Sequence, residues 1–302
     1  MSDFIQVLIS VTVLLKVVSS EPFFDIKDPT FIEECVREHN MYRTNVNPSA
    51  SYMRYMTWDE GLAVTARAWA RFCTFKHNIY LREVRRMHPT FPSVGENIWA
   101  GHPYTSFTVK SAVKLWADEV QHYDYYAPKP NQCKKGEVCG HYTQVVWADT
   151  YKVGCAAQAC PNGVAETHFS TEPGVIFVCN YATAGNYRGV DPYRTGPSCS
   201  SCGPEKCENK LCRNSTRDAL HSYNWTPDWD PALSSCGTFC VTLAFHSWFL
   251  WGPPLLLLAV TSNAASGRHE HAASTACTAA WCPNHGLNLS YPTMNVKRID
   301  VI

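Results

Sequence analysis

The sequence lacks an excess of either charge. Its 302 residues carry 26 Lys and Arg against 26 Asp and Glu, so the composition indicates neither a nucleic-acid partner nor strong attraction to an anionic membrane. The 15 cysteines lack zinc-finger spacing, and their density then favours folding in an oxidising secretory compartment. No serine stands in a Gly-x-Ser-x-Gly elbow, which removes one common hydrolase nucleophile.

The first 20 residues are typical of a secretory signal peptide. An apolar run covers residues 7–15, and Val18-Ser19-Ser20 predicts cleavage before Glu21. Asp3 departs from the usual pattern, because positive charge is common at that end. We therefore expect a protein of the secretory pathway, located at the cell surface or in the extracellular space.

Residues 241–261 form an apolar stretch about long enough for a ~30 Å hydrocarbon core. Gly252-Pro253-Pro254 interrupts it, and membrane helices rarely tolerate a double proline there. A single span is our prediction, with a glycolipid anchor and a soluble protein as alternatives. Residues 262–302 are rich in Ala and Ser without periodicity, which predicts a disordered tail.

Apolar spacing predicts three helices between residues 28 and 120. The first begins at Asp28 and has an inward stripe that includes His39. The second follows Thr57-Trp-Asp-Glu60, read as a capping box, and the third is capped by Ser106, with Val120 in its inward stripe. Residues 76–93 are expected to form a basic surface loop.

Strands are predicted at 95–99, 153–160 and 175–181. Helices interleaved with short strands indicate helices packed on both faces of a small sheet. The fold class is therefore α+β.

Two stretches carry a family resemblance. Residues 140–150 read Gly-His-Tyr-Thr-Gln-Val-Val-Trp-Ala-Asp-Thr, and residues 176–187 read Ile-Phe-Val-Cys-Asn-Tyr-Ala-Thr-Ala-Gly-Asn-Tyr. Both resemble the signatures of the CAP superfamily (SCP/TAPS domain), with the glioma pathogenesis-related-like branch as the best match. The resemblance implies an α-β-α sandwich over residues 29–190.

The same resemblance implies a cavity lined by His77, Glu96, Glu119 and His141. Two imidazoles and two carboxylates form either a hydrogen-bond network that fixes the histidine tautomers or a weak metal site. Zinc is the candidate metal, held by His77 and His141, although no cofactor is expected to be required. A catalytic dyad is the third interpretation. His39, His88, His102 and His122 are predicted at the surface or at helix edges.

Residues 195–213 contain four cysteines and are expected to form a hinge. The resemblance implies bridges Cys199–Cys207 and Cys202–Cys212. Seven further cysteines lie between residues 35 and 179, an odd number, so at least one stays unpaired or pairs elsewhere, and Cys35 is a candidate buried thiol. The pairing among the seven stays open.

Residues 214–240 are predicted to form a stalk, with sequons at Asn214 and Asn224. Another sequon follows at Asn288. The aromatic residues Tyr223, Trp225 and Trp229 lie either in a floppy stalk or at a membrane interface.

The leading hypothesis is a non-enzymatic binding or adhesion module, secreted or membrane-tethered, for an extracellular protein or a sterol or other lipid. The resemblance implies roles such as sperm–egg interaction and immune defence. The alternative is a metal-dependent hydrolase with Glu96 or Glu119 as base, and a third is an adhesion component bridged by an unpaired cysteine. The oligomeric state stays open. In cysteine-rich secretory proteins of this superfamily a six-cysteine module linked to ion-channel regulation follows the hinge, whereas here only Cys236 and Cys240 precede the apolar stretch, so channel regulation is not expected.

Overall fold

A four-stranded sheet with the order β2–β4–β5–β3 forms the centre of the fold. In the computed structural model, which describes residues 24–233, β4 (Lys152–Cys160) and β5 (Gly174–Ala182) are its antiparallel middle strands. The strand β3 (Gly95–Gly101) pairs antiparallel with β5, and β2 (Thr57–Trp58) pairs parallel with β4. Every residue of β5 is buried, because both faces of the sheet are covered.

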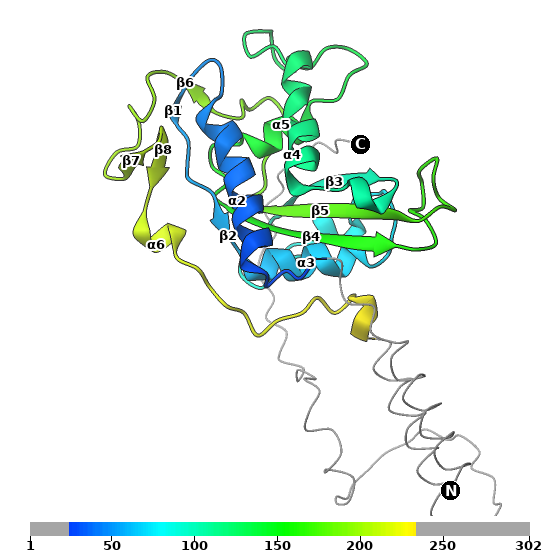
Figure 1. The fold of residues 1–302 in the computed structure, drawn as a ribbon. Helices are drawn as coiled ribbons and strands as arrows, with labels where there is room; N and C mark the ends of the chain where they lie inside the picture. The colour runs from blue at the N-terminus through cyan, green and yellow to red at the C-terminus, as the bar shows by residue number, and fades with distance from the viewer. Residues whose placement is uncertain (1–23, 234–302) are drawn as a thin grey trace, which may run out of the picture. The chain divides into compact units, whose positions relative to one another are not determined.

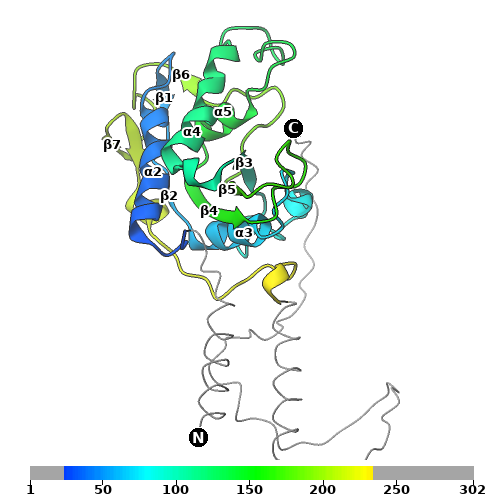
Figure 2. The same ribbon diagram turned by 45° about the vertical axis from the view of Figure 1, so that its right-hand side comes forward.

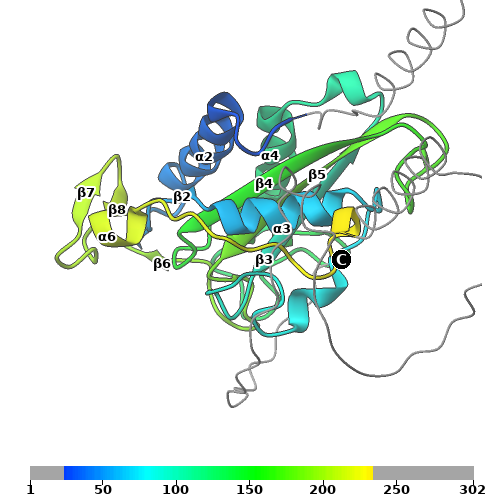
Figure 3. The ribbon, with the colours of Figure 1, turned by 90° about the horizontal axis from the view of Figure 1, so that it is seen from below.

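The covering helices form two outer layers (Figures 1 and 3). Helices α2 (Pro29–Thr44) and α4 (Val109–Asp118) lie on one face of the sheet, and α3 (Glu60–Ala70) lies on the other. The contact between α3 and β4 is close at Gly154, where an added Cβ would lie 2.2 Å from the backbone nitrogen of Ala63. The predicted α-β-α sandwich is confirmed.

Short elements complete the described chain. These are β1 (Ala50–Tyr52), η1 (Ile79–Arg82), η2 (Tyr104–Ser106), η3 (Glu119–His122), α5 (Gly140–Val145), β6 (Arg194–Thr195), β7 (Lys206–Glu208), β8 (Leu211–Arg213) and α6 (Ser215–Asp218). The predicted signal peptide, the apolar stretch 241–261, the tail and the Asn288 sequon lie outside the described residues. Within residues 24–233, no helix is long and apolar enough to cross a membrane.

Two helix starts differ from prediction. Helix α3 is capped by Asp59, whose side chain accepts from the Leu62 amide, because Thr57 is committed to strand β2. Helix α4 is capped by Thr108 in a reciprocal pair with Ser111, since the backbone around Ser106 forms the separate turn η2. The first helix begins after Asp28 as predicted, with the Asp28 carboxylate accepting from Thr30.

The end of the third helix also differs. Helix α4 stops at Asp118, so Val120 lies beyond it in η3 and is exposed instead of facing inward. The residues of the stripe that lie within the helix, including Val113 and Trp116, are buried.

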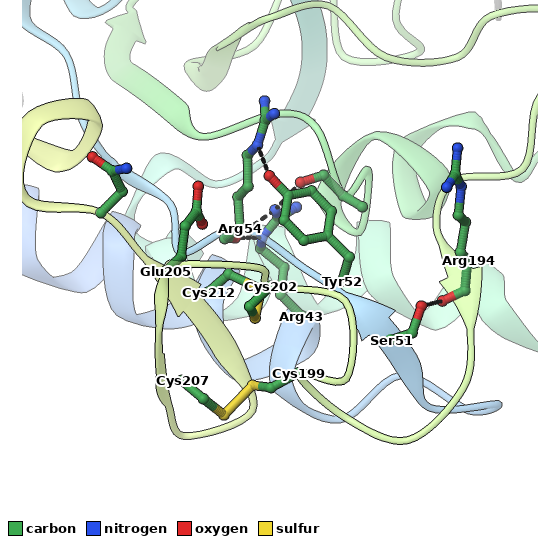
Figure 4. The surroundings of a disulfide bond; sticks show 12 residues. Arg43, Ser51, Tyr52, Arg54, Arg194, Cys199, Cys202, Glu205, Cys207 and Cys212 are labelled. Carbon is green, nitrogen blue, oxygen red and sulfur yellow. Dashed lines mark hydrogen bonds between the residues drawn. A yellow bond between two sulfur atoms is a disulfide. The ribbon is translucent and has the colours of Figure 1, made fainter.

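The hinge is joined to the sandwich by backbone hydrogen bonds. Its bridges are Cys199–Cys207 and Cys202–Cys212 (Figure 4), the pairing that the resemblance implied. The Cys212 amide donates to Met53 O at 2.8 Å, and the Tyr55 amide donates to Cys212 O at 3.0 Å. The hinge is therefore an extension of the domain's own hydrogen bonding.

Three more bridges lie inside the sandwich. They join Cys73 to Cys160, Cys133 to Cys139 and Cys155 to Cys179. Among residues 24–233 this leaves Cys35 as a free, buried thiol, and burial raises its pKa well above the usual value. A buried neutral thiol behaves as a small apolar side chain.

Residues 219–230, here called the strap, run across α3 after the hinge (Figure 3). Tyr223 Oη donates to Asp59 Oδ2 at 2.9 Å, and Trp229 packs between Tyr80 and Trp69, with ring centroids 5.1 and 6.2 Å away. Residues 219–230 are thus part of the folded domain, and the expectation of a floppy stalk is wrong for them. A position of the aromatic rings at a membrane interface stays a prediction.

Candidate functional site

The Glu119 carboxylate closes the N-terminal end of helix α5, which lies beside α4 (Figure 2). Its Oε2 accepts from the backbone amides of His141 at 2.9 Å and Tyr142 at 3.1 Å. Its Oε1 pairs with His141 Nδ1 at 2.5 Å. The preceding residue Cys139 supplies no side-chain cap, so a carboxylate from η3 satisfies the first amide groups and complements the helix dipole.

Glu96 does the same for the loop that carries His77. The Glu96 side chain is fully buried in β3, and its Oε1 accepts from the Asn78 amide and pairs with His77 Nδ1, both at 2.9 Å. With its amide oriented to satisfy both neighbours, Asn180 donates to Glu96 Oε2 at 3.3 Å. Each glutamate therefore ties one histidine and one backbone turn to the sandwich.

These contacts fix the same tautomer in both histidines. A carboxylate accepts at Nδ1, so neutral His77 and His141 carry their proton on Nδ1 and their lone pair on Nε2. The ring of Trp116 stacks on His141, with interplanar angle 10° and centroids 6.3 Å apart. The candidate site therefore consists of two imidazole rings, each held in a fixed orientation by a hydrogen bond to a carboxylate.

The donor set bears on the zinc hypothesis. Both oxygens of Glu119 and at least one of Glu96 already accept hydrogen bonds, so the imidazole rings are the remaining candidates for zinc ligands. Among residues 24–233, no group of three or more His, Cys, Asp or Glu side chains is placed to hold a metal ion. Two imidazoles supply half of a tetrahedral zinc site, so the carboxylates do not complete one.

A pocket of about 330 Å³ opens beside α5. Helix α5 and the two loops at 123–140 and 186–192 form its walls. Polar groups at its base hold one another, since Thr143 Oγ1 donates to Asn186 Oδ1 at 2.7 Å and Asn186 Nδ2 donates to Gly140 O at 2.9 Å. Apolar and aromatic groups line the rest, among them Tyr123, Trp147, Tyr187 and Val190.

The other end of α5 is held by Arg43, a residue that the sequence did not single out. Its guanidinium is buried and donates to Val145 O at 3.0 Å and to Trp147 O at 2.7 Å. Further donations reach Arg54 O, Ala148 O and Thr150 O. Burial lowers the Arg43 pKa to about 9, so the side chain stays charged at neutral pH and complements the negative end of the helix dipole.

His39 and His88 are not at the surface, and the prediction that placed them there is wrong. His39 Nδ1 donates to Cys35 O at 2.7 Å, and Nε2 accepts from Tyr181 Oη at 2.8 Å. His88 Nε2 donates to Asp59 Oδ1 at 3.0 Å. Both rings are fully buried because a distant polar partner satisfies each of them.

Asn97 links this core to the site. Its Nδ2 donates to His141 O at 3.1 Å and to Tyr181 Oη at 3.2 Å. Asn97 directly follows Glu96 in the sequence Gly95-Glu96-Asn97, and this position next to a cavity residue is the sequence signal that could have identified it. The other two histidines lie nearer the surface, where His102 pairs with Glu172 and His122 with Glu137.

Comparison with known proteins decides the family. The profile of the CAP, cysteine-rich secretory protein family matches residues 36–181. GLIPR1-like protein 1 of Bos taurus is 48% identical over 212 residues, which cover 70% of this chain and 83% of the bovine protein. This chain belongs to the CAP family.

Similarity to other CAP proteins identifies the branch of the family to which the chain is related. Glioma pathogenesis-related protein 1 of Mus musculus is 45% identical over 262 residues, 84% of this chain and 92% of the mouse protein, which confirms the expected branch. The crystal structure of NaASP2 with Zn²⁺ aligns at 25% identity and a TM-score of 0.47, covering 62% of this chain and 96% of that one. CAP proteins of this kind are generally secreted or membrane-associated and are generally not classical enzymes.

Proposed function

We propose that this CAP protein is a non-enzymatic binding module, secreted or membrane-tethered, that takes a protein or lipid partner at the pocket beside α5. The pocket carries the proposal. Its mixed lining of aromatic rings and a few fixed polar groups is typical of ligand sites. Burial raises the pKa of Tyr123 in its wall, so that phenol remains a neutral hydrogen-bonding group at physiological pH.

The engagement of the glutamates supports a binding role over hydrolysis. A general base needs a lone pair within reach of water or substrate, and hydrogen bonds from α5 already occupy three of the lone-pair sites of the Glu119 carboxylate. Glu96 is fully buried. We infer that both carboxylates stabilise the fold, whereas a hydrolase would need one of them to transfer a proton.

The test uses the full chain made in mammalian cells and compares two variants, each of which replaces a half-exposed aliphatic side chain with arginine. Val190 lines the pocket and is 53% exposed, while Leu115 on α4 is 54% exposed and lies outside it. Val190→Arg should lower binding about tenfold or more, since a ligand that enters the pocket would have to remove water from the new charge. Leu115→Arg should leave binding unchanged.

Two probes cover the two partner classes. Tritiated cholesterol in a filter assay reports lipid binding, and adhesion of protein-coated beads to cells reports a protein partner. Equal binding by the Val190 and Leu115 variants, or no binding of either probe by the unmodified chain, would overturn the proposed site. Peptide or ester hydrolysis that disappears with a chelator and with His141→Ala would overturn the non-enzymatic assignment.

A further inference from the structure

One disulfide bridge lies in the wall of the pocket. Cys133 and Cys139, which pair with one another, both line it, and so do Glu137 and Val138 between them. The other bridges among residues 24–233 contribute no cysteine to the lining. Residues 133–139, here called the wall loop, therefore contain a covalent cross-link at the proposed ligand site itself.

The wall loop has few other attachments. Among the described residues, positions 135–138 make one backbone hydrogen bond, from Glu137 N to Lys134 O, and this bond stays inside the loop. The Glu137 carboxylate lies 3.7 Å from His122 Nε2. Cys139 directly precedes α5, so the bridge holds the end of the loop beside the start of that helix. Without the bridge, residues 134–138 would be free to move away from the pocket.

Helix α5 is held independently of this bridge. The Glu119 carboxylate accepts from its first amide groups, and the Arg43 guanidinium donates to its last carbonyl group. Glu119 belongs to η3 and Arg43 to α2, so both lie outside the wall loop. Opening the bridge would therefore move one wall of the pocket and leave the helix at its side in position.

The bridge can be reached from solvent. Cys133 is partly exposed, and residues 134–138 are all exposed. Both members of the Cys155–Cys179 bridge, by contrast, are fully buried. Access is one of the factors that set the rate of thiol–disulfide exchange, so a reductant in solution would reach the pocket bridge before the bridge inside the sheet.

The charge of the wall loop favours attack by an anion. Lys134 and Lys135 directly follow Cys133, and neither is in an ion pair among residues 24–233. The one acid of the loop, Glu137, faces His122. The thiolate is the reacting form in thiol–disulfide exchange, and cations without a partner beside the sulfur atom attract it.

We propose that the Cys133–Cys139 bridge is a redox switch that controls the affinity of the pocket for its ligand. This regulation rests on the proposed function, in which the pocket is the binding site. A thiolate of an extracellular dithiol oxidoreductase attacks Cys133 Sγ, the S–S bond breaks, and Cys139 leaves as a thiolate. The second thiolate of the reductant attacks the reductant's own sulfur in the mixed disulfide and releases Cys133. Two electrons pass from the dithiol to the bridge, and the two cysteines take up the two protons that the dithiol gives up.

The test uses the full chain made in mammalian cells, with its bridges formed. Thioredoxin, regenerated by its reductase and NADPH, supplies the dithiol, and alkylation followed by peptide mass spectrometry shows which cysteines are reduced. Binding is measured with tritiated cholesterol and with cell adhesion of protein-coated beads. Reduction of Cys133–Cys139 should lower binding about tenfold, since loss of contact with one aliphatic side chain such as Val138 has about this effect.

Two double variants separate this bridge from an accessible bridge elsewhere. Cys133→Ser with Cys139→Ser should lower binding about tenfold and abolish the response to thioredoxin. Cys199→Ser with Cys207→Ser removes a hinge bridge outside the pocket lining, and should leave both the binding and the response unchanged. Hydrogen exchange on the reduced, unmodified chain gives an answer even where a variant fails to fold. Exchange should become faster at residues 134–138 and stay unchanged in β4 and β5.

The outcomes distinguish the switch from the proposed function. No binding of either probe by the oxidised chain overturns the pocket as the binding site, and the switch with it. Undiminished binding after Cys133 and Cys139 are shown to be reduced overturns the switch and leaves the binding function standing. Two other results also overturn the switch alone: a bridge that thioredoxin does not reduce, and a loss of binding with faster exchange throughout the sheet, which indicates unfolding.

Discussion

Acidification should destabilise this domain through His39. Burial lowers the His39 pKa from 6.5 to about 4, and both ring nitrogens are engaged, by Cys35 O and by Tyr181 Oη. Protonation puts a second N–H on the ring. The Nε2 atom can then no longer accept from Tyr181, and the charge lies in a fully buried position close to the cation Arg43.

The direction in which the free energy of unfolding changes with pH follows from the His39 pKa in the folded and unfolded states. An unfolded chain takes up a proton at His39 near pH 6.5, whereas the folded domain takes it up only near pH 4. The unfolded state therefore binds more protons between these values, and the free energy of unfolding falls as the pH falls. This contribution is fully present above about pH 6.5, and the gap corresponds to about 3 kcal/mol lost by pH 4.

Denaturant unfolding of the full chain, followed by tryptophan fluorescence at pH 7, 6, 5 and 4, measures this loss. Asp59 contributes as well: burial acts to raise its pKa, but the hydrogen bond from His88 and the other polar contacts of Asp59 together outweigh burial and the pKa is lowered, so its contribution to stability begins to be lost as the pH approaches 4. The informative quantity is therefore the difference between the unmodified protein and His39→Gln. That difference should shrink by about 3 kcal/mol from pH 7 to pH 4. A difference constant to within about 0.5 kcal/mol would refute the reasoning.

Three further changes have defined outcomes. Arg43→Met removes the side-chain donor to Val145 O, the last carbonyl group of α5, and to four further carbonyl groups. It should lower the free energy of unfolding by about 3–5 kcal/mol, measured by denaturant unfolding; a loss below about 1 kcal/mol contradicts the capping role. Gly154→Ala drives a methyl group into the backbone of α3 and should cost about 3 kcal/mol or more, seen as a lower Tm, and an unchanged Tm refutes the close contact. Glu119→Ala removes the oxygen that accepts from two backbone N–H groups of α5, and should speed hydrogen exchange at His141, whereas Glu137→Ala at the surface should not.

Local patterns predicted the elements whose partners are near in sequence. The start of α2 followed from Asp28, and the layers followed from helical stripes alternating with short apolar strands. The start of α3 did not follow, because Thr57 and Asp59 are both good capping residues. Only the pairing of Thr57 opposite Lys152 across β2 and β4 decides between them.

The buried polar groups were harder to predict for the same reason. His39 lies on the inward stripe of its helix, which was a signal for burial, but its partner Tyr181 is 142 residues away. The strap depends on Trp229 meeting Trp69 and Tyr80, rings that lie far earlier in the chain. Sequence periodicity contains no information about such contacts, and so the sequence of this segment, which lacks periodicity, predicts a stalk.

The four cavity residues were named from the resemblance, and the structure arranges them as two pairs, His77 with Glu96 and His141 with Glu119. Whether these pairs serve recognition stays a prediction. Their role in stabilising the fold could be expected from chemistry alone, because a carboxylate accepts hydrogen bonds from a nearby imidazole N–H and from the free backbone N–H groups at the start of a helix.

Helix α5 is held at both ends by side chains of opposite charge, Glu119 at its first amide groups and Arg43 at its last carbonyl group and the turn that follows. A helix this short has little stability of its own, so its order was acquired when the domain folded. Any molecule that settles against Gly140 or Thr143 meets a surface whose conformational entropy has already been lost. Association there carries no ordering penalty for the helix, and a weak set of contacts is enough for measurable affinity.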